Sequence, residues 1–165
     1  VTKLDSSGKQ VWQWTAPALV HSVAVDSQFN VYAGDDVNYV TKLNSSGKQL
    51  WQWMASTYVY SVAVDSQFNV YAGDGSSHVT KLDSSGKQVW QWTAPALVHS
   101  VAVDSQFNVY AGDDVNYVTK LNSSGKQLWQ WMASTYVYSV AVDSQFNVYA
   151  GDYNYHVTKL QTAKS

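Results

Sequence analysis

Cysteine and glutamate are both absent from this 165-residue chain. Without cysteine there can be no disulfide, no thiol nucleophile and no thiolate zinc site. Without glutamate, aspartate is the only side-chain carboxylate, and most aspartates precede turn residues, where such side chains cap backbone amides. We therefore expect no catalytic residues, no metal site, no cofactor and no enzyme activity.

Long apolar runs and an excess of one charge are also missing. The longest apolar runs are too short to cross a bilayer, and we expect no signal peptide and no membrane partner. The formal net charge is -2, with lysine and aspartate spread evenly along the chain. Because nucleic-acid binding needs a basic face, we expect no nucleic-acid partner.

The chain does contain an exact internal repetition. Ser22 to Asp35 recurs unchanged at 61–74, 100–113 and 139–152, so that the copies begin 39 residues apart. Each copy holds two short β-rich runs, Ser22–Val25 and Val31–Ala33 in the first copy, on either side of a polar turn. A second pair of runs, Val1–Leu4 and Gln10–Trp14, flanks the turn sequence Asp-Ser-Ser-Gly-Lys. Each unit therefore predicts four short antiparallel strands.

Four strands in a unit of about 40 residues are typical of a β-propeller blade. No window has apolar residues at helical spacing, so we predict an all-β fold. The prediction is a single domain made of a β-propeller of four-stranded antiparallel blades. Its repeats are 1–39, 40–78, 79–117 and 118–156, followed by an extra strand at 157–160 and a polar tail at 161–165.

Two segments resemble a known repeat family. Val40-Thr-Lys-Leu-Asn-Ser-Ser-Gly47 and Val62-Ala-Val-Asp-Ser-Gln-Phe-Asn-Val-Tyr-Ala-Gly73 look like the SBBP β-propeller repeat, a relative of NHL-type repeats. The resemblance implies a propeller but no particular activity. The family usually has glycine where Phe29 and its three copies stand. Because phenylalanine disfavours positive φ, we predict a different turn geometry there.

The repeats are too similar for ordinary divergence. Residues 1–39 are identical to 79–117, and residues 40–74 are identical to 118–152. This identity favours an engineered repeat protein, or else a very recent amplification.

Odd and even units differ mainly in two loops that a propeller places on one face of its disc. Loops at one end of a rigid scaffold often form binding sites. We therefore weigh two hypotheses, a structural, self-assembling scaffold and a module that binds a sugar or other small molecule through this face or through an axial channel near Ser22, Ala24 and Asp26. The candidate ligand-binding residues are His21, Asp36, Tyr39, Tyr58, Tyr60, His78, His99, Asp114, Tyr117, Tyr136, Tyr138 and His156.

Paired tryptophans occur in the fourth strand of each unit, for example Trp12 with Trp14 and Trp51 with Trp53. Alternate residues of a strand share one face, so each pair could stack on a sugar or seal the gap between blades. We favour the second interpretation, because exposed tryptophan favours aggregation.

The ends of the repeat array raise the question of closure. The sequence begins with the third strand of a blade, and a copy of that strand, Val157–Leu160, follows the fourth unit. Open ends would leave unpaired strand edges and a bare apolar blade face. We therefore predict that the partner is a second copy of this chain and that the homodimer closes a ring of eight blades.

Overall fold

The computed structural model describes residues 1–160, and within them every regular element is a β-strand. The strands form five separate antiparallel sheets. No helix in residues 1–160 has the length and apolar character needed to cross a membrane. The polar tail predicted at 161–165 lies outside the described residues. The prediction of an all-β chain with repeated four-stranded antiparallel sheets is confirmed.

The first sheet shows how a repeat folds. Its strands follow the chain order, with each strand hydrogen-bonded to the next. They are β3 (Val20–Val25), β4 (Val31–Asp35), β5 (Tyr39–Leu43) and β6 (Gln49–Met54).

The second and third sheets repeat this arrangement. The second consists of β7 (Val59–Val64), β8 (Val70–Asp74), β9 (His78–Leu82) and β10 (Gln88–Thr93). The third consists of β11 (Val98–Val103), β12 (Val109–Asp113), β13 (Tyr117–Leu121) and β14 (Gln127–Met132).

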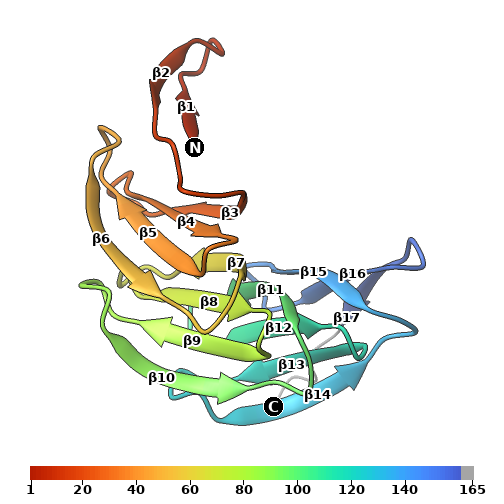
Figure 1. Cartoon of the computed structure of the whole chain (residues 1–165). Helices are drawn as coiled ribbons and strands as arrows, with labels where there is room; N and C mark the ends of the chain where they lie inside the picture. The colour runs from red at the N-terminus through yellow and green to blue at the C-terminus, as the bar shows by residue number, and fades with distance from the viewer. Residues whose placement is uncertain (161–165) are drawn as a thin grey trace.

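Two incomplete sheets flank these three. The N-terminal hairpin contains β1 (Thr2–Leu4) and β2 (Gln10–Gln13), the third and fourth strands of a unit. The C-terminal sheet contains only β15 (Val137–Val142), β16 (Val148–Asp152) and β17 (Val157–Leu160). The five sheets form an open arc, and the hairpin and the C-terminal sheet lie at its two ends (Figure 1).

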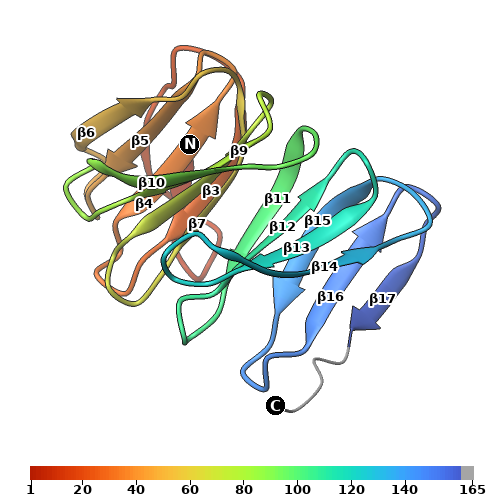
Figure 2. The same cartoon turned by 90° about the horizontal axis from the view of Figure 1, so that it is seen from below.

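In the three complete sheets and in the C-terminal sheet, the first strand lies on the inside of the arc. β3 contacts β7, β7 contacts β11, and β11 contacts β15. Figure 2 shows these strands side by side, with the later strands of each sheet further out and β17 at the edge of its sheet.

The core lies between successive sheets, because each sheet is apolar on both faces. Tyr32 and Val40 of the first sheet pack in one cluster with Val59, Val62 and Val70 of the second. The same cluster recurs between the second and third sheets and between the third and the C-terminal sheet. Burial of these side chains is the main attraction that holds neighbouring sheets together.

The tryptophans seal the outer part of the joints from the N-terminal hairpin to the third sheet, as predicted. The indole Nε1 of Trp51 donates to the Ser84 carbonyl in the next sheet, at 3.1 Å. Its ring lies against Gly86, where an added Cβ would be 2.9 Å from the ring. Trp12 and Trp90 make the same contacts with the following sheets.

The prediction for the phenylalanine turn is wrong. Phe29, Phe68, Phe107 and Phe146 all have φ between 63° and 65°. The turn keeps this conformation because hydrogen bonds hold both its ends. In the second sheet Phe68 N–H donates to the Asp65 carbonyl, and the Asp65 carboxylate accepts bonds from Gln67 N–H and Asn69 N–H. These bonds offset the strain of a side chain at positive φ.

Candidate functional site

A β-bulge interrupts each of the innermost strands β3, β7, β11 and β15, and one residue occupies each bulge. In the first sheet, Val20 pairs with Asp35 and Ser22 with Gly34, so His21 has no direct partner in β4. The same register shift occurs in the other three sheets. A bulge redirects a side chain away from the regular alternation of a strand. The four bulge residues are His21, Tyr60, His99 and Tyr138.

Their rings form a continuous series from sheet to sheet. The His21 and Tyr60 ring centroids are 5.0 Å apart, Tyr60 and His99 are 5.9 Å apart, and His99 and Tyr138 are 4.3 Å apart. Tyr153 extends the series at 6.0 Å from Tyr138. We call these five residues the aromatic ladder. Three of these spacings are within the range of favourable ring contacts, and the His99–Tyr138 pair is slightly closer.

An aspartate holds each ladder histidine. Nε2 of His21 faces Oδ1 of Asp36 within hydrogen-bonding distance, and His99 faces Asp114 in the same way. These aspartates belong to the turns between the second and third strands. Asp36 N–H in turn donates to the Leu19 carbonyl in the preceding loop, at 3.0 Å. The structure thus brings together the two variable loops that the sequence placed on one face.

Two flanking tyrosines complete the surface around the ladder. The ring centroid of Tyr58 lies 6.5 Å from that of Tyr60, and the ring centroid of Tyr136 lies 6.2 Å from that of Tyr153. Tyr58, Tyr136, Tyr138 and Tyr153 all keep a substantial part of their side chains exposed. Exposed aromatic faces beside paired polar groups have the chemistry to contact a sugar or another flat ligand.

The remaining predicted site residues lie apart from the ladder. Tyr39, His78 and Tyr117 begin β5, β9 and β13, two strands further out in their sheets, and His156 immediately precedes β17. His78 Nδ1 faces Asp74 Oδ2 at 3.2 Å, and its backbone N–H also donates to Asp74. This histidine therefore helps to fix its own turn.

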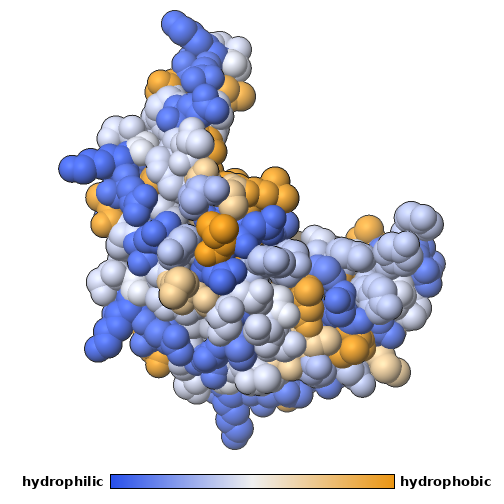
Figure 3. Space-filling view, in the orientation of Figure 1, coloured by the Kyte–Doolittle hydropathy of each residue, from blue (hydrophilic) through white to orange (hydrophobic). Residues whose placement is uncertain are grey.

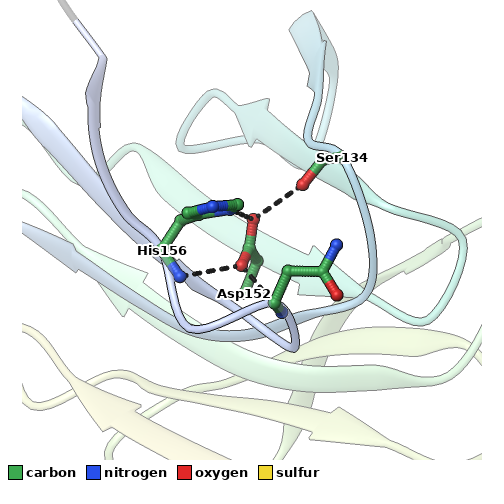
Figure 4. Close-up of polar contacts among 4 residues, drawn as sticks. Ser134, Asp152 and His156 are labelled. Carbon is green, nitrogen blue, oxygen red and sulfur yellow. Dashed lines mark hydrogen bonds and ion pairs between the residues drawn. The ribbon is translucent and has the colours of Figure 1, made fainter.

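The corresponding turn of the C-terminal sheet adds a serine to the aspartate and histidine. Ser134 Oγ donates to Asp152 Oδ2 at 3.1 Å, and His156 Nδ1 lies 3.3 Å from the same oxygen (Figure 4). Partial burial acts to raise the pKa of Asp152. The hydrogen bonds from His156 N–H and from Ser134 outweigh it and leave that pKa lowered.

The order of these three groups differs from that of a hydrolytic triad. In such a triad histidine lies between serine and aspartate and removes the serine proton. Here Asp152 lies between Ser134 and His156 (Figure 4). The ionised carboxylate accepts a hydrogen bond from the serine hydroxyl, but a carboxylate is a weak base. This arrangement therefore caps a turn and does not activate a nucleophile.

Asp26 does not serve an axial ligand site. The Asp26 carboxylate is buried and accepts hydrogen bonds from Gln28 N–H, Asn30 N–H, the Asn30 side-chain amide and the Tyr32 hydroxyl. The same network recurs at Asp65, Asp104 and Asp143. Since both oxygens are already used, these carboxylates stabilise the turn. Within residues 1–160, histidines and aspartates do not gather in groups of three or more that could hold a metal ion.

Sequence reasoning missed two contributors to this face, Tyr153 and Ser134. Tyr153 had a signal in the sequence, because Tyr153-Asn-Tyr155 replaces the Gly75-Ser-Ser77 of the second unit. Its contacts with Tyr136 and Tyr138 give that difference a structural role, which is to extend the ladder beyond the last bulge residue.

The repeated four-stranded antiparallel sheets, stacked through their faces around a series of innermost strands, define a β-propeller repeat protein. The family model described as outer membrane protein assembly factor BamB matches residues 1–165, and the chain belongs to this family, PQQ_2. No match was found among curated proteins.

Proposed function

We propose that this protein is a structural, self-assembling propeller scaffold without catalytic activity, and that two copies join end to end into one ring of eight blades. The observation that supports this proposal most directly is that the two ends of the arc present complementary halves of the contact that joins its inner sheets. Four separate features of that contact can be compared.

The first feature is a groove at the N-terminal end. Val1, Lys3 and Trp12 of the hairpin line it together with Val23, Val25 and Phe29. Val23 is 54% exposed, whereas its equivalent Val62 is 6% exposed. Figure 3 shows apolar side chains gathered where the hairpin joins the body, beside the gap between the two ends.

Within the chain, a tyrosine occupies the corresponding space. Tyr32 packs between the first two sheets, with its ring 6.0 Å from Trp51 and with Lys42 Nζ 5.2 Å from its centroid. Tyr71 and Tyr110 do the same in the next joints. The fourth equivalent, Tyr149, lies at the opposite end of the arc and is partly exposed. A second copy would place its Tyr149 in the groove.

The second feature is a glycine in the second strand of each sheet. A Cβ on Gly34, Gly73 or Gly112 would come within 2.6–2.7 Å of a valine in the following sheet. A Cβ on Gly151 would meet only Ser139 of its own sheet, at 3.7 Å. The valine that would cover Gly151 is the one equivalent to Val59, which is Val20 at the N-terminal end.

The third feature is the glycine of the outer turn. Gly47, Gly86 and Gly125 each lie against a tryptophan of the preceding sheet, whereas nothing lies within 4 Å of a Cβ built on Gly8. The matching tryptophan is Trp129 in β14, which belongs to the sheet before the C-terminal one. A second copy would bring its Trp129 against Gly8.

The fourth feature is a hydrogen bond near the axis. Val62 N–H donates to Ser22 Oγ at 3.1 Å, and the same bond joins Val101 to Ser61 and Val140 to Ser100. The remaining equivalent pair is Val23 and Ser139, one at each end of the arc. All four features therefore pair an N-terminal group with a C-terminal one, and the arc holds those ends apart (Figure 1). Two head-to-tail joints close a ring of two chains.

Assembly is tested by sedimentation velocity and native mass spectrometry at micromolar concentration. We expect a species of twice the 18.3 kDa chain mass. Gly151→Ala should abolish it, because the new Cβ would occupy the space of the partner's Val20. Asn154→Ala, an exposed change in the turn between β16 and β17, should leave it unchanged. Only the 18.3 kDa species, or a Gly151→Ala protein that still dimerises with wild-type affinity, would contradict the proposal.

The absence of catalysis is tested separately. We expect no turnover of ester, glycoside or phosphate substrates above the uncatalysed rate. Turnover that is lost when His21 and His99 are replaced would contradict the proposal and assign the aromatic ladder to catalysis.

The exposed aromatic ladder supports a second candidate function, the binding of a sugar or small molecule on the loop-rich face. Thermal unfolding in the presence of sugars tests it. A ligand at about a hundredfold excess over its Kd should add about 3 kcal/mol to the free energy of unfolding. Tyr138→Ala should remove that gain without preventing assembly. No stabilisation by any sugar tested would leave the scaffold function alone.

We also propose the narrower relationship to SBBP and NHL-type repeats, and an engineered or recently amplified origin. The first is supported by the segments 40–47 and 62–73, and the second by the identity of residues 1–39 with 79–117.

A further inference from the structure

We propose that β17 is a placeholder strand, which covers the edge of β16 until the β1 strand of a second copy displaces it. This inference rests on the proposed self-assembly and names the segment of the partner that binds. It also identifies a competing contact within the chain that would weaken assembly.

The two strands have the same sequence. β17 pairs with β16 through Val157 to Leu160, and Val1 to Leu4 at the other end also reads Val-Thr-Lys-Leu. In the first sheet, the equivalent Val40 to Leu43 pairs with β4 in the same register. The partner's β1 can therefore make the contacts with β16 that Val157 to Leu160 make.

The contact includes a matched lysine. Lys159 Nζ lies 5.6 Å from the Tyr149 ring centroid, as Lys42 does over Tyr32. In the assembled ring the equivalent lysine would be Lys3 of the partner. Exchange of one strand for the other therefore preserves the cation–π contact.

The surroundings of the two strands decide which of them leaves. β1 forms a closed hairpin with β2, in which the Val1 amino group donates to the Trp14 carbonyl and Trp14 N–H donates to the Val1 carbonyl, both at 2.8 Å. The hairpin is also fixed to the first sheet by the Trp12 indole, which donates to the Ser45 carbonyl. β17 pairs with β16 alone.

The five residues after Leu160 also differ from the turn that follows every other copy of this strand. Every other copy of this strand is followed by Asp or Asn and then Ser-Ser-Gly-Lys, the turn that leads to the fourth strand. Gln161-Thr-Ala-Lys-Ser follows Leu160 instead. The partner hairpin would supply the third strand, that turn with Gly8, and the fourth strand together.

Hydrogen-bond direction supplies a matched pair of test substitutions. Asp152 N–H donates to the His156 carbonyl, so the alternation of an antiparallel ladder makes Ala150 and Thr158 the next hydrogen-bonded pair. In the hairpin, Val1 and Trp14 form the hydrogen-bonded pair, so Thr2 N–H points away from β2. Proline removes this N–H, so Thr158→Pro weakens β17 on β16, whereas Thr2→Pro leaves the hairpin bonds intact.

The test measures the dimer Kd of wild type, Thr158→Pro and Thr2→Pro by sedimentation equilibrium. Release of β17 is needed at both joints. The apparent Kd therefore varies as the inverse square of the fraction of chains with a free β16 edge. If about a third of chains are open, Thr158→Pro should lower Kd about tenfold. Thr2→Pro should raise Kd at least tenfold, because the incoming strand loses its bond to Ala150. A truncation after His156 should act like Thr158→Pro and guards against local misfolding in that variant.

The outcomes separate the two proposals. If wild type, Thr158→Pro and the truncation all remain monomeric at 100 µM, the proposed self-assembly fails, and this inference fails with it. If the wild type dimerises while Thr158→Pro and the truncation leave Kd unchanged, only the placeholder role is wrong. If Thr158→Pro raises Kd and Thr2→Pro has no effect, β17 remains in the ring and β1 is displaced, which overturns the inference.

Discussion

At the scale of the residue, the most repeated chemical unit is an aspartate that closes the turn between the first two strands. Asp65 accepts two backbone N–H groups, the Asn69 amide and the Tyr71 hydroxyl. Burial, and next the bond to Asp65, raise the pKa of Tyr71, so the phenol keeps its proton and remains a donor. This network allows a phenylalanine at positive φ, because the hydrogen bonds that hold the turn offset the backbone strain.

The same network predicts a loss of stability in acid. The Asn147 amide, with further hydrogen bonds, lowers the pKa of Asp143 to about 2 against the effect of burial. A lowered pKa in the folded state adds stability above about pH 4, and that contribution is lost as the pH falls towards 2. Burial raises the pKa of Asp113. This carboxylate therefore has the opposite effect on the pH dependence of stability.

We therefore expect the thermal midpoint of the wild type to fall between pH 5 and pH 2. Asp143→Asn, which has no carboxylate to protonate, should show a smaller fall. Circular dichroism melts of both proteins across this range provide the measurement. Equal slopes for the two proteins would show that Asp143 does not contribute to the acid sensitivity.

At the scale of the element, the joint between neighbouring sheets is the unit that holds the fold. Each joint needs a backbone without a side chain at one point, since a Cβ on Gly112 would come within 2.6 Å of Val137. The outer strands carry a bulge in their pairing, as at Gln88 to Trp90. Bulges of this kind discourage further pairing at a sheet edge, which favours contact through the faces and ends.

A pair of alanine substitutions distinguishes an occupied joint from an open one. Gly112→Ala should lower the free energy of unfolding by about 1–3 kcal/mol, because the methyl group overpacks a filled joint. Gly151→Ala should change it by less than about 0.5 kcal/mol, since the nearest side-chain atom is 3.7 Å away.

Both variants should be compared by urea unfolding in a Thr2→Pro background and at a chain concentration below its dimer Kd, so that assembly does not contribute to stability. A large loss in Gly151→Ala under these conditions would mean that Gly151 already lies in a packed joint of the single chain.

At the scale of the whole molecule, the arc exposes at its ends what it buries between its sheets. Leu4 is 56% exposed, whereas its equivalents Leu43, Leu82 and Leu121 are fully buried. Assembly through these ends would bury them, and the stability of the chain would then depend on its concentration.

We expect the thermal midpoint of the wild type to rise by about 1–3 °C for each tenfold increase in chain concentration. The midpoint of Gly151→Ala should stay constant over the same range. Differential scanning calorimetry from 5 to 500 µM provides the measurement. A constant midpoint for the wild type would argue that the ends stay apart.

The strands could be predicted closely from the sequence, because the apolar runs and turn residues recur unchanged. The predicted strand at Ser22–Val25 extends to Val20–Val25, and the one at Val31–Ala33 extends to Val31–Asp35. The candidate site could be predicted only in part. The loops of His21 and Asp36 could be placed on one face, but a bulge at His21 leaves no pattern in the sequence, so the alignment of ring with ring could not be foreseen.

The sequence by itself determined the local structure. Asp-Ser-Ser-Gly turns and β-branched runs specify short antiparallel strands, and exact repetition specifies equal sheets. The tertiary structure alone decided which copies of one residue are covered. Gly8, Gly47, Gly86 and Gly125 have the same local sequence signal, yet only the last three contact a tryptophan. The reason is that burial depends on the neighbouring sheet, and a sheet at the end of an arc lacks one neighbour.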